Sequence, residues 1–171
     1  MSPGGSPRIH SGEDVTAQYR FQQRFPVPAA RAFRWCIDYR PGDLAVEGVG
    51  GRRRVRRIAD DLVILTDTIF RYGKSSIVKT KLVRIRPSQM SWTSTHLTGP
   101  HRLSQFWYRI VSDGPRASHL DFTGFHVARN VSSTGAAARA KLAARLARED
   151  ARGWKRYAAA MTADLGPSRQ K

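Results

Sequence analysis

The sequence KLAARLAREDARGWKRYAAAMTADL, at residues 141–165, is the longest stretch of uniform periodicity in the chain. It has no proline and is rich in alanine, leucine and arginine, which all favour the α-helix. Large apolar side chains recur along it at spacings of three, four and eight residues, which is typical of an amphipathic helix. The side chains on the apolar face are Leu146, Trp154, Tyr157, Met161 and Leu165.

Asp150 is unusual because a rotation of roughly 100° per residue places it on this apolar face, between Leu146 and Trp154. A carboxylate in such surroundings must be hydrogen-bonded, paired or hydrated, since burying it bare costs several kcal/mol. Two interpretations stay open. Either Asp150 orients a ligand hydroxyl or transfers protons with a raised pKa, or it is structural, paired with an arginine or at a frayed edge of the face.

Gly153 lies at the edge of the same face, beside Trp154. Glycine inside an exposed helix costs roughly 1 kcal/mol relative to alanine. It therefore indicates either close packing or room for a ligand. Trp154 and Tyr157 each join a large apolar surface to one polar group, which suits both a ligand pocket and an ordinary core.

The rest of the chain is mainly of β type. Residues 17–27 alternate apolar and polar side chains as a half-buried strand does, and residues 29–39 follow as a short helix that Pro28 can open. Six further runs are rich in Val, Ile, Thr and aromatic residues, with short turn sequences between them, which predicts hairpins and an antiparallel meander. These runs are residues 52–60, 62–73, 75–87, 89–100, 102–114 and 117–128.

One strand, a short helical region, six strands and one long helix together predict an α+β fold. A curved antiparallel sheet of seven strands has one apolar concave face, and residues 141–165 form the one long apolar helix available to cover it. We expect a disordered N-terminal arm at residues 1–14, a single domain at residues 15–166 and a flexible tail at residues 167–171.

Composition bounds the class of protein. The 171 residues suit one domain, and 40% hydrophobic with 25% charged residues is ordinary for a globular chain. No run approaches the ~18 apolar residues of a membrane span, and the first residues lack the apolar core of a signal peptide, so we expect a cytoplasmic protein. The single cysteine, Cys36, excludes an internal disulfide and a cysteine-based zinc site.

The charge balance is strongly basic, with 30 Lys and Arg against 13 Asp and Glu and a net charge of +17. Such a surplus attracts nucleic acid, ribosomes or anionic membranes, but an arginine-rich proteome would produce it too. The densest basic run is RRRVRR at residues 52–57. It is either an edge strand protected by charge or a polyanion-binding edge. The candidates for polyanion binding are Arg52, Arg53, Arg54, Arg56 and Arg57.

The predicted order of elements resembles the START/Bet v1-like (SRPBCC) superfamily over roughly residues 17–165. FPVPAARAFRWCID, at residues 25–38, is similar to the end of that family's first strand and the opening of its first helix. FWYRIVSDGPRASHLDFTGFHV, at residues 106–127, is similar to its late hairpin, and DARGWKRYAAAM, at residues 150–161, to the closing helix of its polyketide-cyclase and lipid-transport-like members. The resemblance implies a helix-grip fold, with short helices after strand one and an apolar or amphipathic small molecule held between helix and sheet.

Strand alternation selects the side chains that would face such a cavity. Trp92 and His96 share one face of their strand, as do Phe122 and His126 of theirs, whereas Trp107 contradicts the pattern by pointing outward. The two histidines are candidates for a proton-transfer or hydrogen-bonding pair inside the cavity, or are structural groups. Asp150, His96 and His126 are the candidate catalytic residues. The predicted ligand contacts are Phe21, Phe33, Trp92, Phe106, Tyr108, Phe122, Asp150, Gly153, Trp154 and Tyr157.

Three functional hypotheses follow. The first is binding or transport of a lipid, polyketide or isoprenoid-like molecule. The second is a cofactor-independent aromatase or cyclase in which Asp150, His96 or His126 moves protons on a polyketide-type substrate. The third is a basic surface that binds ribosome, RNA or anionic membrane. We expect neither a metal nor a cofactor, because no metal-ligand spacing or nucleotide-binding motif is present; the ligand, enzymatic activity and choice between monomer and homodimer stay open.

Overall fold

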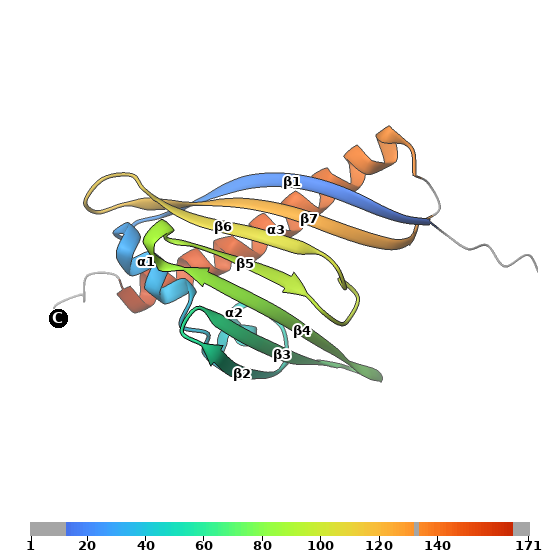
Figure 1. Cartoon of the computed structure of the whole chain (residues 1–171), viewed down its shortest axis with the longest axis horizontal. Coiled ribbons are helices and arrows are strands. Elements are labelled where there is room, and N and C mark those ends of the chain that lie inside the picture. The colour runs from blue at the N-terminus through green and yellow to red at the C-terminus, as the bar shows by residue number, and fades with distance from the viewer. Residues whose placement is uncertain (1–12, 132–133, 166–171) are drawn as a thin grey trace, which may run out of the picture.

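The computed structural model describes residues 13–131 and 134–165, which form a seven-stranded antiparallel sheet, three α-helices and one 3-10 turn (Figure 1). The predicted α+β fold and the predicted order of its elements are confirmed. The strands are β1 (Glu13–Phe25), β2 (Gly51–Ala59), β3 (Leu62–Arg71), β4 (Lys74–Arg86), β5 (Ser91–His96), β6 (Gln105–Ser112) and β7 (Ser118–Val131). The helices are α1 (Ala29–Cys36), α2 (Asp43–Val46) and α3 (Ala136–Leu165), with the 3-10 turn η1 at Pro87–Gln89.

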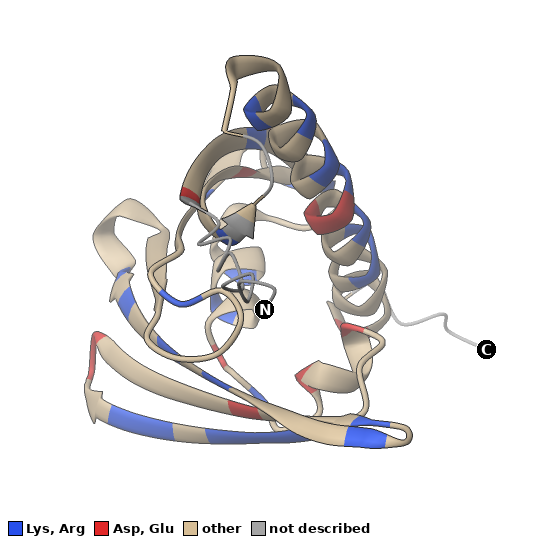
Figure 2. Ribbon diagram, turned by 90° about the vertical axis from the view of Figure 1, so that its right-hand side faces the viewer, with Lys and Arg blue, Asp and Glu red and all other residues tan. Residues whose placement is uncertain are grey.

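The sheet curves around α3 (Figures 1 and 2). Its strands pair in the order β1-β7-β6-β5-β4-β3-β2, so that β2 to β7 form a meander and β1 closes against β7. The two edges of the sheet are therefore β1 and β2. Because one face of the curved sheet is apolar, it needs a cover, and α3 supplies it while packing closely on β1.

Successive side chains of a strand point to opposite faces of the sheet, so every second residue of a strand faces α3. In β1 the buried Tyr19 and Phe25 alternate with the exposed Arg20 and Arg24, as the sequence predicts. Antiparallel pairing then brings inward residues of neighbouring strands opposite one another, so that the concave face consists of rows running across the sheet. The side chains of each row therefore decide whether the space beneath α3 is apolar or polar at that position.

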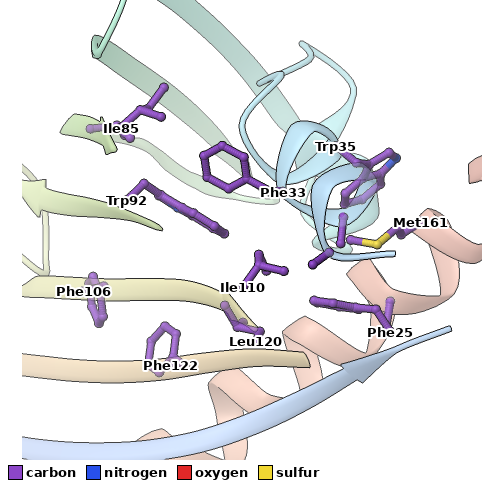
Figure 3. Packing of buried hydrophobic residues seen from close by; sticks show 14 of the residues in the cluster. Phe25, Phe33, Trp35, Ile85, Trp92, Phe106, Ile110, Leu120, Phe122 and Met161 are labelled. Atoms are coloured by element: carbon purple, nitrogen blue, oxygen red, sulfur yellow. The ribbon is translucent and has the colours of Figure 1, made fainter. Parts of the chain in front are cut away.

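A hydrophobic core fills one end of this space (Figure 3). Phe25, Phe33, Trp35 and Met161 meet there between α1, α3 and the sheet, and Met161 is completely buried. Truncating a side chain of this kind to alanine costs about 2–5 kcal/mol. This end of the fold is therefore closed by packing.

The first strand is longer than predicted. It begins at Glu13 rather than Ala17, because β7 continues to Val131 and provides backbone partners for the earlier residues. Glu13 and Asp14 thus belong to the sheet and not to the N-terminal arm. The remainder of the predicted arm, residues 1–12, lies outside the described residues.

The closing helix is also longer, since α3 starts at Ala136, before the predicted start at residue 141. The predicted tail, residues 167–171, lies outside the described part of the chain. Within residues 13–131 and 134–165, no helix is long and apolar enough to span a membrane.

Candidate ligand-binding cavity

A cavity of about 400 Å³ lies between α3, the first two helices and the concave face of the sheet. All seven strands contribute side chains to its wall. Pockets for small organic molecules have volumes of roughly 300–1,000 Å³. The space is therefore large enough for a compact small molecule.

One end of the cavity, beside the core, is an aromatic wall. Register places Trp92 opposite Tyr108 and Tyr108 opposite Phe122 on adjacent strands. The rings of Trp92 and Tyr108 stack with centroids 4.8 Å apart, and Phe122 meets Tyr108 edge-on at 5.2 Å. Trp154 closes over them from α3, with its ring centroid 5.8 Å from that of Tyr108. We call Trp92, Tyr108, Phe122 and Trp154 the aromatic end.

Asp150 faces the cavity and has a tyrosine as its partner. The Tyr19 hydroxyl donates a hydrogen bond to Asp150 Oδ2 at 2.5 Å. Burial raises the pKa of Asp150, and the hydrogen bond from Tyr19 offsets part of that rise. The arginine partner that the sequence suggested is thus replaced by a neutral hydroxyl group.

Gly124 explains why Tyr19 can reach Asp150. These two residues of β1 and β7, Tyr19 and Gly124, are paired directly opposite each other. A β-carbon added to Gly124 would overlap the Tyr19 ring near its hydroxyl group. The absence of a side chain therefore lets the tyrosine ring lie flat across β7 and point its hydroxyl at α3.

Gly153 marks open space. A β-carbon built there meets no atom within 4 Å in the described structure, and the residue lines the cavity. Close packing, one of the two interpretations of this glycine, is therefore excluded. Its missing side chain leaves room beside Asp150 and Trp154.

Histidines gather at the opposite end of the cavity. His96 lies four residues beyond Trp92 on β5, His126 lies four residues beyond Phe122 on β7, and His101 comes from the loop between β5 and β6. The His101 ring is 5.7 Å from that of His96 and 5.0 Å from that of His126, between centroids. Together with Lys79 of β4, these three histidines form what we call the ionisable end.

The histidines of the ionisable end are held neutral. Burial and the positive charge of Lys81 lower the pKa of His96 to about 3. Burial and the neighbouring His126 lower the pKa of His101 to about 4, and burial also lowers the pKa of His126. Neutral imidazoles can each donate one hydrogen bond and accept another.

A charged network of Arg53, Asp67, Asp43, Glu47 and Lys81 lies next to this end. Arg53 donates to both oxygens of Asp67 at 2.7 and 3.0 Å, to Glu47 at 3.0 Å and to Asp43 at 3.3 Å. Lys81 Nζ lies 3.2 Å from Asp67 Oδ2. Although burial opposes ionisation, hydrogen bonds from Arg53 and the charge of Lys81 outweigh it and lower the pKa of Asp67 to about 2. The network thus keeps a fully buried carboxylate charged.

This network corrects the predicted polyanion-binding row. Arg53 is buried and its guanidinium group is occupied by carboxylates, because its side chain points to the concave face. It therefore offers no charge to a partner on the surface. The other four arginines of the row are exposed on the edge strand β2, namely Arg52, Arg54, Arg56 and Arg57.

Two predicted ligand contacts do not line the cavity. Phe21, on the edge strand β1, stacks on Phe122 with ring centroids 4.5 Å apart. Phe33, on α1, packs on Trp92 within the core with ring centroids 6.0 Å apart. Their apolar faces are used by packing. The predicted residues that do line the cavity are His96, His126, Trp92, Phe106, Tyr108, Phe122, Asp150, Gly153, Trp154 and Tyr157.

Several residues of the wall were missed by the sequence interpretation. Lys79 and Lys81 share the inward parity of Val83 on β4, so alternation along this strand could have identified them. His101 carries no such signal because it lies in a loop. Trp107, the exception to alternation, is 41% exposed on the outer face of the sheet. Among residues 13–131 and 134–165, no group of three His, Cys, Asp or Glu side chains could hold a metal ion.

Comparison with known proteins rests on structure. The sequence matches no protein-family model and has no significant match among curated proteins. Among solved structures, it is similar to the Zhui aromatase/cyclase from Streptomyces sp. R1128, with a TM-score of 0.71 and 13% identity over 90% of this chain and 98% of that one. A START superfamily protein from Mycobacterium smegmatis gives a TM-score of 0.63 and 15% identity over 85% and 99% of the two chains.

Norcoclaurine synthase from Thalictrum flavum, solved in complex with dopamine and hydroxybenzaldehyde, gives a TM-score of 0.61 and 10% identity over 98% of each chain. The likeness in each case extends over nearly the whole of the solved structure. At such low identities it bears on the fold and not on activity. The chain has the START/Bet v1-like helix-grip fold.

Proposed function

We propose that the protein binds or carries an apolar or amphipathic small molecule in the cavity beneath α3. The observation that carries the proposal is the space of about 400 Å³ with an aromatic wall at one end and polar side chains at the other. Binding pockets combine apolar walls with a few convergent polar groups in this way. The fold neighbours support it, since the norcoclaurine synthase structure holds two small aromatic molecules.

The test uses Gly153 to fill the cavity. Native mass spectrometry of the purified protein is expected to detect a bound small molecule, or binding of an added uncharged aromatic compound. Gly153→Leu places a side chain in the open space and should abolish binding while the fold persists. Ala159→Leu, at an exposed position of the same helix, is the matched control and should bind normally. Equal binding by both variants would contradict the proposal.

A second candidate is a cofactor-independent cyclase or aromatase, favoured by the hydrogen bond between Tyr19 and Asp150 inside the cavity. A carboxyl group with a raised pKa, joined to a hydroxyl group, is suited to move a proton on a bound substrate. The fold neighbour named as an aromatase/cyclase supports this candidate. Asp150→Asn should abolish turnover of a polyketide-type substrate if Asp150 is catalytic, but only shift affinity if it orients the ligand.

The third candidate, a polyanion-binding edge, retains the four exposed arginines Arg52, Arg54, Arg56 and Arg57 of β2. Neutralising them together should remove salt-sensitive retention on heparin if they form such an edge. Retention that survives this change would exclude the row as the binding surface.

A further inference from the structure

Lys79 is a cation without a direct counter-charge. It lies opposite Asp67 in the pairing of β3 and β4, faces the cavity and is half-buried. Asp67, however, is occupied by Arg53 at 2.7 Å and Lys81 at 3.2 Å. No ion-pair partner lies within 4 Å of the Lys79 ammonium group in the described structure. Burial and the charge of Lys81 accordingly lower the pKa of Lys79.

His96 has an unused polar atom in the same region. The residue is only 6% exposed, and its Nδ1 atom has no hydrogen-bond partner within the described part of the chain. An unsatisfied buried polar group costs about 1–3 kcal/mol in a folded protein. His96 lines the cavity, and an unsatisfied buried group of this kind calls for a partner such as a water molecule, an ion or a ligand group.

The electrostatic potential at this end favours a negative charge. Besides burial, the groups that lower the pKa of His96 and His101 are Lys79, Lys81 and the neighbouring histidines. Of the nearby carboxylates, Glu47 and Asp43 bind Arg53, Asp150 binds Tyr19, and Glu149 lies 4.0 Å from Arg145. A bound anion would supply the negative counter-charge that Lys79 lacks.

We propose that the ionisable end, Lys79 with His96, His101 and His126, is a subsite for the acidic group of the ligand. The ligand is then an amphipathic acid, with an apolar ring-containing body on the aromatic end and a carboxylate at Lys79 and His96. This inference rests on the proposed function, because it names the chemical class of the molecule that the cavity binds.

The chemistry of the donors fits a carboxylate. The Lys79 ammonium group has three N–H donors and each neutral imidazole has one, whereas a carboxylate has only acceptors. Hydrogen bonds with an ionised partner are roughly twice as strong as neutral ones, and the lower dielectric constant of a protein interior strengthens them further.

The spacing of the two ends limits the length of the ligand. Four residues of β5 separate Trp92 from His96, a distance of about 13 Å along an extended strand. A body of a few fused or linked rings, or a short isoprenoid chain, spans that distance to a terminal acid group.

The experiment uses two fluorescent probes with one skeleton. N-phenyl-1-naphthylamine is uncharged, and 8-anilinonaphthalene-1-sulfonate is its anionic sulfonate. Wild-type protein should bind the anionic probe more tightly. Lys79→Met should weaken binding of the anionic probe roughly ten- to a hundredfold, which corresponds to the loss of one charge-assisted hydrogen bond. The affinity for the uncharged probe should stay within about twofold of wild type.

Two further variants sharpen the result. Lys74→Met removes the same charge from an exposed position of β4 and should leave the ratio of the two affinities unchanged. His96→Phe keeps an aromatic ring beside Phe106 but removes both ring nitrogens, and should give a smaller loss for the anionic probe.

The outcomes separate the two proposals. If the uncharged probe binds and Lys79→Met does not change the ratio of affinities, the acidic subsite is wrong while the cavity remains a binding site. A wild-type preference for the uncharged probe leads to the same conclusion. If neither probe binds the wild-type protein, the proposed binding function fails and the subsite fails with it.

Discussion

The aromatic end and the ionisable end of the cavity share the strands β5 and β7, but their side chains are stabilised by different means. At the aromatic end, Trp92, Tyr108 and Trp154 satisfy one another by ring contact and burial. At the ionisable end, the half-buried Lys79 has no ion-pair partner and the buried His96 Nδ1 has no hydrogen-bond partner among the described residues. The difference teaches that packing completes one end of the cavity, whereas the other end has polar groups that the proposed ligand would complete.

The ionisable end depends on the charged network beside it. Asp67 is fully buried and carries a negative charge only because Arg53 and Lys81 surround it. A buried ion pair adds little net stability, but removing one partner leaves an uncompensated charge. Among the described residues, the side chains of the aromatic end do not depend on a charged partner in this way, since they are stabilised by burial and ring contacts.

Breaking the charged network should have the largest effect. Asp67→Ala leaves Arg53 and Lys81 without their central carboxylate and should lower the free energy of unfolding by about 3–5 kcal/mol. Urea denaturation followed by circular dichroism measures the loss. Asp60→Ala, at an exposed turn, is the control and should stay within about 0.5 kcal/mol of wild type. Similar values for both variants would show that the network is not needed for stability.

Acid should lower the stability of the folded protein through His96 at the ionisable end. The pKa of His96 is about 3 in the folded protein, well below the 6.5 of an ordinary histidine, so between these values the unfolded chain binds a proton that the folded chain does not. Stability must therefore fall as the pH drops from 6.5, by about 1.4 kcal/mol per pH unit for this group. His96→Phe should flatten the pH dependence of unfolding between pH 6.5 and 4. Parallel curves for the variant and wild type would exclude this role.

Changing the aromatic end should affect both kinds of ligand equally. Trp154→Ala removes the ring that closes the cavity from α3 and should cost about 2 kcal/mol of binding, roughly thirtyfold, for charged and uncharged probes alike. Trp107→Ala removes the same side chain from the exposed outer face and should leave binding unchanged. If Trp154→Ala weakened binding of the anionic probe alone, the aromatic end would not act equally on charged and uncharged ligands, and the prediction would be wrong.

The smallest effect is expected between the two ends, at Asp150. Tyr19→Phe removes the hydroxyl group that donates to the carboxylate, so the pKa of Asp150 should rise further and the free energy of unfolding should fall by about 1 kcal/mol. Carbon-13 NMR of the side-chain carboxyl group follows the pKa. Tyr72→Phe, at a fully exposed tyrosine, is the control. An unchanged pKa for Asp150 in Tyr19→Phe would show that the hydrogen bond does not stabilise the carboxylate.

Much of the wall could be predicted from the sequence, and the errors have identifiable causes. Alternation correctly assigns Trp92, His96, Tyr108 and Phe122 to the concave face, because a strand turns its side chains by a fixed period. It fails for Phe21, which has the correct parity but is packed against Phe122 and does not line the cavity, although Tyr19 of the same strand does. Parity states which face a residue occupies, but not how far along the face the cavity extends.

Arg53 illustrates a second limit. Its neighbours Arg52 and Arg54 are exposed, and the run of like charges suggested a single surface for all of them. The curvature of the sheet and the position of α2 bring Asp43 and Glu47 over Arg53, the buried arginine of the run. No local pattern contains this information, since the partners come from another element.

By itself, the sequence determined the long C-terminal helix α3, the seven strands and their order along the chain, and therefore the α+β arrangement, because periodicity and turn chemistry act between residues close in the chain. The helix-grip fold followed from the resemblance to the START/Bet v1-like superfamily. Only the tertiary structure decided that Tyr19 meets Asp150 across 131 residues, and that Lys79 joins His96, His101 and His126 at one end of a cavity. Such contacts depend on strand register and on the position of α3 against the sheet. Both are set by packing of the whole domain, so the chemistry of the site emerges only once the chain is folded.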